Sequence, residues 1–283
     1  MRTGILAIFW ISLAQAASPG YDRALDLYQR TEYQQSLTLL EKLPTKNVEV
    51  LQLMGQAYFG LSEYKKATEV FEKAIVLAPG KSELYHWLGR TYGRRAETGS
   101  MLTALSYASK TRQYFEKAVE LDPNNGEAVN DLFDFYLEAP GFLGGGMQKA
   151  EDVAQRIAKL DAAEGHYAQA KLHDKRKEYG AAENNFRRAA ELSPLEVGRV
   201  LDIAKYLAKL GRTSESDAMF EKAVKMAPDS PKVLFDRAQT YIQAQRNLPE
   251  ARLLLERYLK STLTPEDPSK ETAESMLRKL PKP

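Results

Sequence analysis

The sequence predicts an all-α fold in which helix–turn–helix units stack into an α-solenoid, and three observations lead to this prediction. Between Val48 and Lys81, large apolar residues recur three, four and seven positions apart, as on one face of a helix. Gly60 then interrupts this pattern, a second helical face follows, and Pro79 ends it. The pattern also returns along the chain, since Phe186 and Phe220 are 34 residues apart.

Two short helices joined by a tight turn cannot bury their apolar faces alone, so such a unit needs copies of itself. The spacing resembles the tetratricopeptide repeat (TPR), a helix–turn–helix unit of 34 residues. Its clearest copy carries the marker residues Leu51, Gly55, Tyr58, Ala67, Phe71, Ala74 and Pro79. The resemblance implies a right-handed superhelix of about seven units, in which the first helix of each unit lines a concave groove.

The units follow one another from the first helix to the tail. Terminal repeats are atypical because one face meets solvent, which fits the early Pro44 of the first unit and a polar helix after Asp267-Pro268. We expect a degenerate repeat 1 at 17–47, repeat 2 at 48–81, repeat 3 with an insertion at 82–125, repeat 4 with a glycine-rich insertion at 126–162, repeats 5, 6 and 7 at 163–196, 197–230 and 231–264, and a capping helix and tail at 265–283.

Repeats 3 and 4 depart from the regular spacing at their internal turns. The first- and second-helix aromatics of repeat 3, Tyr92 and Phe115, are 23 residues apart, where a regular unit has 13. We expect a loop from Arg94 to Ser100, followed by an extra helical turn or a longer second helix. In repeat 4, Pro140–Gly146 combines proline with consecutive glycines, which cannot continue a helix.

The N-terminus predicts export. Arg2 precedes an apolar run of ten residues, Ile5–Ala14, which is too short to span a bilayer, and Ala14-Gln15-Ala16 is a typical cleavage site. We interpret residues 1–16 as a signal peptide and expect a periplasmic or extracellular protein with no membrane segment after cleavage. The chain has no cysteine, which excludes disulfides, acyl-cysteine anchors and Cys-ligated metal.

Charged residues at groove-facing positions are candidates for partner binding. The resemblance places three basic i, i+4 pairs in the groove: Arg90 and Arg94, Lys171 and Lys175, and Lys205 and Lys209. Such a basic stripe could hold an acidic segment or a carboxylate, with Asn130 as a further polar contact. The alternative is that these cations pair with Asp134, Glu138 and Asp174 on a solvated face.

An apolar patch accompanies the basic stripe. The groove-facing positions also include Tyr167, Leu201, Phe235 and Ile242, which could receive partner side chains. The alternative is that they close against neighbouring first helices.

No pattern points to catalysis, a metal or a cofactor. His166 and His173 occupy packing positions of repeat 5, while His86 is expected to face the groove alone. Gly141–Gly146 lacks the preceding strand and the GK[ST] sequence of a phosphate-binding loop. The net charge of +2 does not favour nucleic acid.

The sequence therefore predicts a non-enzymatic interaction scaffold of the cell envelope that binds a partner polypeptide in its concave groove. The alternative is a small-molecule-binding accessory of an envelope transport system. A deep apolar pocket near the insertions of repeats 3 and 4 would favour that alternative.

Overall fold

The computed structural model describes residues 19–281, and all regular structure in this range is helical, which confirms the all-α class. The predicted signal peptide at 1–16 lies outside the described residues. The helices are α1 (Pro19–Gln29), α2 (Tyr33–Lys42), α3 (Val48–Gly60), α4 (Tyr64–Leu77), α5 (Ser82–Thr98), α6 (Met101–Leu121), α7 (Gly126–Glu138), a 3-10 turn η1 (Gly141–Leu143), α8 (Met147–Leu160), α9 (Ala162–Lys175), α10 (Tyr179–Leu192), α11 (Val197–Lys209), α12 (Thr213–Met226), α13 (Pro231–Gln243), α14 (Leu248–Lys260) and α15 (Lys270–Lys279).

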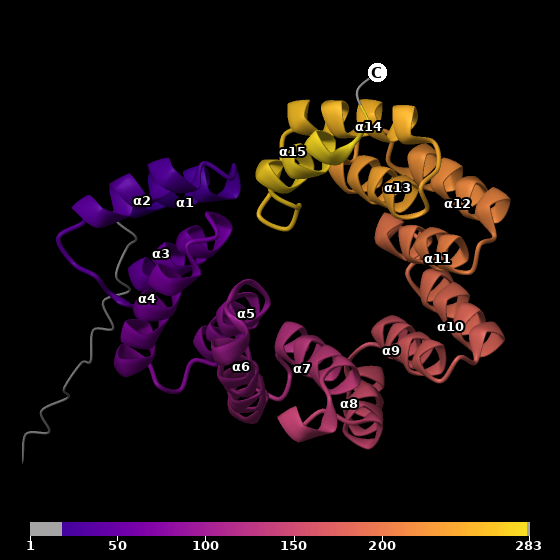
Figure 1. Ribbon diagram of the computed structural model, residues 1–283. Helices are drawn as coiled ribbons and strands as arrows, with labels where there is room; N and C mark the ends of the chain where they lie inside the picture. Colours follow the sequence, from indigo (N-terminus) through magenta and orange to yellow (C-terminus); the bar gives the residue numbers. More distant parts are fainter. Residues whose placement is uncertain (1–18, 282–283) are drawn as a thin grey trace, which may run out of the picture.

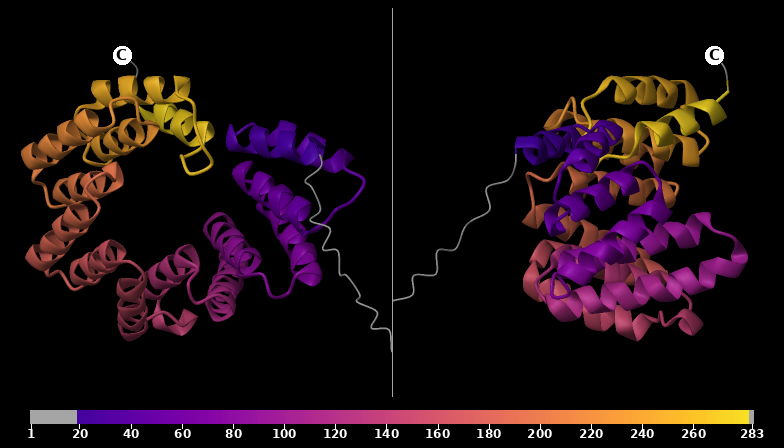
Figure 2. Two further views of the ribbon diagram at one scale, coloured as in Figure 1. Left: turned by 180° about the vertical axis from the view of Figure 1, so that it is seen from behind. Right: turned by 90° about the vertical axis from the view of Figure 1, so that its left-hand side faces the viewer.

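The helices pack in consecutive pairs, and each pair packs on the next along a curved path (Figure 1). From α3 to α14, the first helix of each pair faces the inside of the curve, and the second lies outside (Figure 1). The path brings α1 and α2 close to α15 in the views from opposite sides (Figures 1 and 2). Burial raises the pKa values of Tyr28 and Tyr33, and the carboxylate of Glu266 adds to both rises. The two ends of the solenoid therefore face each other. Over residues 19–281, no helix is both long and apolar enough to cross a membrane.

Small residues in first helices allow close contact with aromatic rings of second helices. A Cβ placed on Gly55 would lie 2.6 Å from the ring of Phe71, and one on Gly89 would lie 2.5 Å from the ring of Phe115. Both distances are shorter than any normal contact, so the glycines are needed for the rings to fit. The buried apolar side chains form clusters that follow one another along the chain, each built from neighbouring repeats.

The regular internal turns share one backbone feature. Within the described range, repeats 1, 2, 5, 6 and 7 each place a residue with φ between 50° and 74° just after the first helix: Thr31, Ser62, Lys177, Gly211 and Gln245. This left-handed conformation reverses the chain within a few residues. Repeats 3 and 4 lack it at this point, and they are the two expanded units.

The loop predicted from Arg94 to Ser100 is wrong, because most of this segment lengthens α5, but the longer second helix expected after it is confirmed by α6, which begins at Met101. Helix α5 continues through Arg94 and Arg95 to Thr98, and only Gly99 and Ser100 separate it from α6. The guanidinium of Arg95 lies 5.3 Å from the ring of Tyr92 and 4.3 Å from that of Tyr107. The contact with Tyr107, which includes a hydrogen bond of 2.7 Å from Arg95 to the Tyr107 hydroxyl, joins the two extensions as a helical hairpin. In repeat 4, the helix stops before Pro140 as expected, and α8 begins at Met147.

Ion pairs on the outer side also connect successive repeats. Glu183 on α10 accepts hydrogen bonds from Arg187 of the same helix at 2.7 and 2.9 Å, and from Arg212 at the start of α12. Burial of Glu183 opposes its ionisation, but the hydrogen bonds from the two arginines outweigh this and lower its pKa. Glu183 therefore links the outer helices of repeats 5 and 6 as a carboxylate.

We predict that Gly89→Ala destabilises the protein, because the new methyl group overlaps the ring of Phe115. Overpacking of this kind costs roughly 1–3 kcal/mol, which exceeds the gain of about 1 kcal/mol from replacing a helical glycine. The matched control is Gly93→Ala one turn later in α5, where the new Cβ would meet only Thr111 at 3.7 Å. This control should raise stability. Denaturant unfolding of both variants tests the prediction, and equal shifts for the two would contradict it.

We predict that Glu183→Gln lowers stability by roughly 1 kcal/mol at neutral pH, since a mostly buried carboxylate loses charge-assisted hydrogen bonds. A carboxylate whose pKa falls on folding stabilises the protein at any pH above the pKa that the group has in the unfolded chain. This stabilisation disappears as the pH falls through the pKa that the group has in the folded protein. The melting temperatures of the two proteins should therefore converge below about pH 4. Thermal unfolding followed by circular dichroism over a pH series measures this, and a pH-independent difference would contradict it.

Candidate functional site

A hollow of about 520 Å³ opens on the concave face where the two expanded repeats meet, and we call it the repeat 3–4 hollow. Three successive first helices contribute to it, through Phe59 on α3, Arg90 on α5 and Asp134 on α7, which places it on the inner side of the solenoid. It is lined by Phe59, Arg90, Gly93, Arg94, Ala96, Glu97, Ala108, Thr111, Phe115, Asp131, Asp134, Phe135, Glu138, Ala139, Pro140 and Leu143.

Both expansions are needed to build the hollow. The extension of α5 and α6 supplies Ala96 and Ala108, while Pro140 and Leu143 come from the turn of repeat 4. Gly93 leaves space on α5, since a Cβ there would have no neighbour closer than 3.7 Å.

The turn of repeat 4 is held against α6 and α8. The carbonyl oxygen of Gly144 accepts a hydrogen bond from Lys149 at 2.9 Å. Gly144 has a φ of 90°, and a Cβ there would lie 2.7 Å from Arg112 Nε. The left-handed backbone favours glycine at this position, so the turn that carries Leu143 into the wall of the hollow depends on it.

The hollow combines aromatic surface with charges of both signs at its rim. The guanidinium of Arg90 lies 4.6 Å from the ring of Trp87 and 5.6 Å from that of Phe59. Arg94 pairs with Glu97 and donates a hydrogen bond to the hydroxyl of Tyr64 at 3.2 Å. Such a site suits an apolar group that carries a polar or charged end.

Carboxylates from α7 form the opposite side of the rim. Asp131 Oδ2 lies 2.8 Å from Nε2 of His86 and 3.8 Å from Nε of Arg90. Burial raises the pKa of Asp134, and the ammonium group of Lys171 opposes that rise. His86 is 2% exposed, so the expectation that it faces the groove alone is wrong. It packs against Phe115 and takes Asp131 as its partner.

The four lysines of the predicted basic stripe lie in ion pairs between repeats. Lys175 pairs with Glu138 at 2.7 Å and Lys205 with Asp236 at 3.2 Å, while Lys171 and Lys209 contact Asp134 and Asp174. Nearby Asp202 and Asp236 outweigh the effect of burial on Lys205 and raise its pKa. The concave face of repeats 4–7 therefore carries alternating charges. This is the alternative to an unpaired basic stripe, in which the cations pair with acidic side chains.

The other predicted groove residues lie away from the repeat 3–4 hollow. Phe235 is 3% exposed and packs 5.1 Å from the ring of Tyr258, so it closes against a neighbouring helix. Leu201 is also fully buried, so its side chain is not open to the groove. Tyr167 packs edge-on against Phe186 and under the guanidinium of Arg199, and burial raises its pKa. Asn130 is half-buried on α7.

Residue spacing identified Arg90 and Arg94 but missed the walls of the hollow. Asp131, Phe135, Leu143 and Ala139 belong to a helix face or turn that no repeat pattern marks as groove-facing. The pair of insertions did point to this region, where an apolar pocket was expected to favour small-molecule binding, since adjacent expanded turns lie side by side in a solenoid.

The histidines of repeat 5 serve packing and local bonding. His166 Nδ1 lies 2.9 Å from Oδ1 of Asn185 on the second helix of the repeat, and His173 contacts Glu178. Within residues 19–281, no three His, Cys, Asp or Glu side chains are arranged to hold a metal ion.

Comparison with known proteins identifies the family. Tetratricopeptide repeat family models match residues 48–81 and 201–268. The chain is a tetratricopeptide repeat protein. A TPR protein from Parabacteroides merdae has a similar structure, with a TM-score of 0.60, 15% identity, and coverage of 92% of this chain and 96% of that one. A thermophilic TPR protein from Thermus thermophilus gives a TM-score of 0.55 and 19% identity over 66% of this chain and 97% of that one. At these identities the likeness concerns the fold.

One curated relative is the signal recognition particle subunit SRP72 of Dictyostelium discoideum. It is 26% identical to this TPR protein over 111 residues, which are 39% of this chain. The match spans only 16% of the length of that relative.

Proposed function

We propose that this TPR protein is a non-enzymatic scaffold that binds a segment of a partner polypeptide on its concave face. TPR arrays generally mediate protein–protein interaction through such surfaces. The observation that supports this site most directly is the repeat 3–4 hollow, which offers partly enclosed aromatic surface in an otherwise charge-paired groove. An apolar side chain of the partner would be buried there, as at the centre of many interfaces.

The charges around the hollow would orient the bound segment. Arg90 and Arg94 flank one side and Asp131 faces them, so a partner with a dipolar or mixed-charge sequence fits the rim. Further along the groove, Lys175 and Lys209 remain 42% and 57% exposed within their ion pairs. Acidic groups of the partner could share these lysines, and charge complementarity of this kind acts mainly on association rate and selectivity.

We also propose that the protein acts in the cell envelope, either in the periplasm or outside the cell. The support is the apolar run Ile5–Ala14 followed by Ala14-Gln15-Ala16.

A second candidate function is binding of a small molecule as an accessory of an envelope transport system. The volume of the repeat 3–4 hollow, about 520 Å³, favours it. Small-molecule sites typically enclose about 300–1,000 Å³ and combine apolar walls with a few polar groups.

We predict that Gly93→Leu, which projects a side chain into the hollow, weakens partner binding about tenfold or more by filling the site of the central contact. Gly93→Ala is the matched control, since its methyl group leaves most of the volume open. Affinity capture from envelope extract, followed by titration of the captured polypeptide, measures the effect. Equal affinity of the two variants would exclude the hollow as the anchor. If no polypeptide is captured, and a low-molecular-weight ligand is bound by Gly93→Ala but not by Gly93→Leu, the result would favour the second function.

A further inference from the structure

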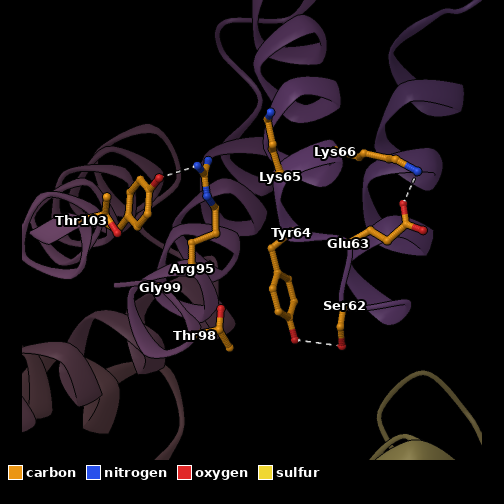
Figure 3. Close-up of a pocket in the computed structure, with 10 residues that line it drawn as sticks. Ser62, Glu63, Tyr64, Lys65, Lys66, Arg95, Thr98, Gly99 and Thr103 are labelled. Carbon is orange, nitrogen blue, oxygen red and sulfur yellow. Dashed lines mark hydrogen bonds and ion pairs between the residues drawn. The ribbon is translucent and has the colours of Figure 1, made fainter. Parts of the chain in front are cut away.

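A second hollow, of about 530 Å³, lies between the internal turns of repeats 2 and 3, and Figure 3 shows the residues that line it. It separates the turn of repeat 2 from the tip of the α5–α6 hairpin, and we call it the edge cavity. Its lining consists of polar residues and tyrosines: Ser62, Glu63, Tyr64, Lys65, Lys66, Arg95, Thr98, Gly99, Thr103 and Tyr107. The proposed groove function does not involve it.

The edge cavity carries positive charge that the protein does not neutralise. Among the described residues, Lys65 has no ion-pair or hydrogen-bond partner, and Figure 3 draws its side chain beside Arg95. The guanidinium of Arg95 donates hydrogen bonds only to neutral hydroxyls, at 2.7 Å to Tyr107 and 3.1 Å to Thr68. Lys66 is paired with Glu63. The lining therefore has a net charge of +2, since three cations face one carboxylate.

Two groups at the edge cavity, the hydroxyl of Ser62 and the start of α6, can donate hydrogen bonds to an anion, whereas the hydroxyls of Thr98 and Thr103 already donate to backbone carbonyl oxygens. The hydroxyl of Ser62 accepts a bond from Tyr64 at 3.2 Å, which leaves its own proton available. Gly99 and Thr103 flank the first turn of α6, whose Ser100 makes no side-chain cap. The first backbone N–H groups of a helix have no partner within it and favour negative charge. Cations and donors on several sides suit a phosphate group.

Exposed apolar side chains lie immediately beside this cationic site. Met101 and Leu102 follow Gly99 in sequence and are 88% and 93% exposed, and Leu105, one turn later, is 53% exposed. They form one apolar stripe on the first turns of α6. The side view shows the α5–α6 turn projecting beyond the neighbouring repeats (Figure 2). In the adjacent repeat, Phe142 of the corresponding turn is 77% exposed.

We propose that this hairpin tip docks on a lipid bilayer that contains anionic phospholipids. The phosphate of a headgroup would occupy the edge cavity near Lys65 and Arg95, and Met101 and Leu102 would enter the interfacial region. A soluble phosphate compound would account for the cations but would leave two almost fully exposed apolar side chains in water. Apolar residues combined with adjacent basic residues are the usual components of a peripheral membrane contact.

The test is flotation of the full chain with vesicles of equal parts phosphatidylcholine and phosphatidylglycerol, beside vesicles of phosphatidylcholine alone. Met101→Ser combined with Leu102→Ser should reduce partitioning to the anionic vesicles about tenfold or more. Lys65→Gln should reduce partitioning to the anionic vesicles by a smaller factor, and should make this partitioning less dependent on salt concentration. The matched control is Leu195→Ser, because Leu195 is 94% exposed but lies in a turn between repeats, at the opposite ends of the helices.

Three results would overturn the proposal. Failure of the unaltered protein to bind anionic vesicles would exclude a membrane contact. Equal binding by the tip variant would assign the binding to another part of the chain, such as the apolar run Ile5–Ala14. Stabilisation by inorganic phosphate, lost in Lys65→Gln and without vesicle binding, would identify a soluble phosphate site instead. All variants change exposed side chains, so circular dichroism and melting temperature should confirm that they remain folded.

Discussion

Close packing between a small residue on one helix and an aromatic ring on the next is the constraint on which the rest of the structure depends. The rings of Phe71 and Phe115 fit only because Gly55 and Gly89 have no side chains. This contact sets how near the two helices of a repeat can lie. Each pair still exposes an apolar face, which only a neighbouring pair can cover. The curved stack follows from repeating this requirement along the chain.

The stacked helices bring charges of successive repeats together on the concave face. Asp134 and Glu138 of repeat 4 meet Lys171 and Lys175 of repeat 5, and Asp174 then meets Lys209 of repeat 6. Partly exposed pairs of this kind add little stability individually. Their main effect is on recognition, because they neutralise a stripe that would otherwise be strongly basic. The partner proposed above would then have to offer shape and apolar surface as well as negative charge.

The two adjacent expansions of repeats 3 and 4 create both candidate binding regions. On the inner side, the lengthened hairpin and the turn at Pro140–Leu143 form the walls of the repeat 3–4 hollow. At the edge, the same hairpin carries the edge cavity and the exposed Met101 and Leu102. The regular repeats thus supply a rigid frame, and the irregular ones supply the distinctive surfaces. Binding residues commonly lie on such departures from a regular scaffold.

The sequence by itself determined the helical class, the TPR unit and the position of the two irregular repeats. These features depend on local spacing: apolar residues three and four apart, glycines opposite aromatics, and proline at helix ends. The tertiary structure decided how the irregular repeats are built and which charges are free. The extra residues of repeat 3 are helical, and Arg95 of α5 packs against the ring of Tyr107 of α6, a contact that spacing does not reveal. Lys171 and Asp134 are 37 residues apart, so their pairing follows from how one repeat stacks on the next.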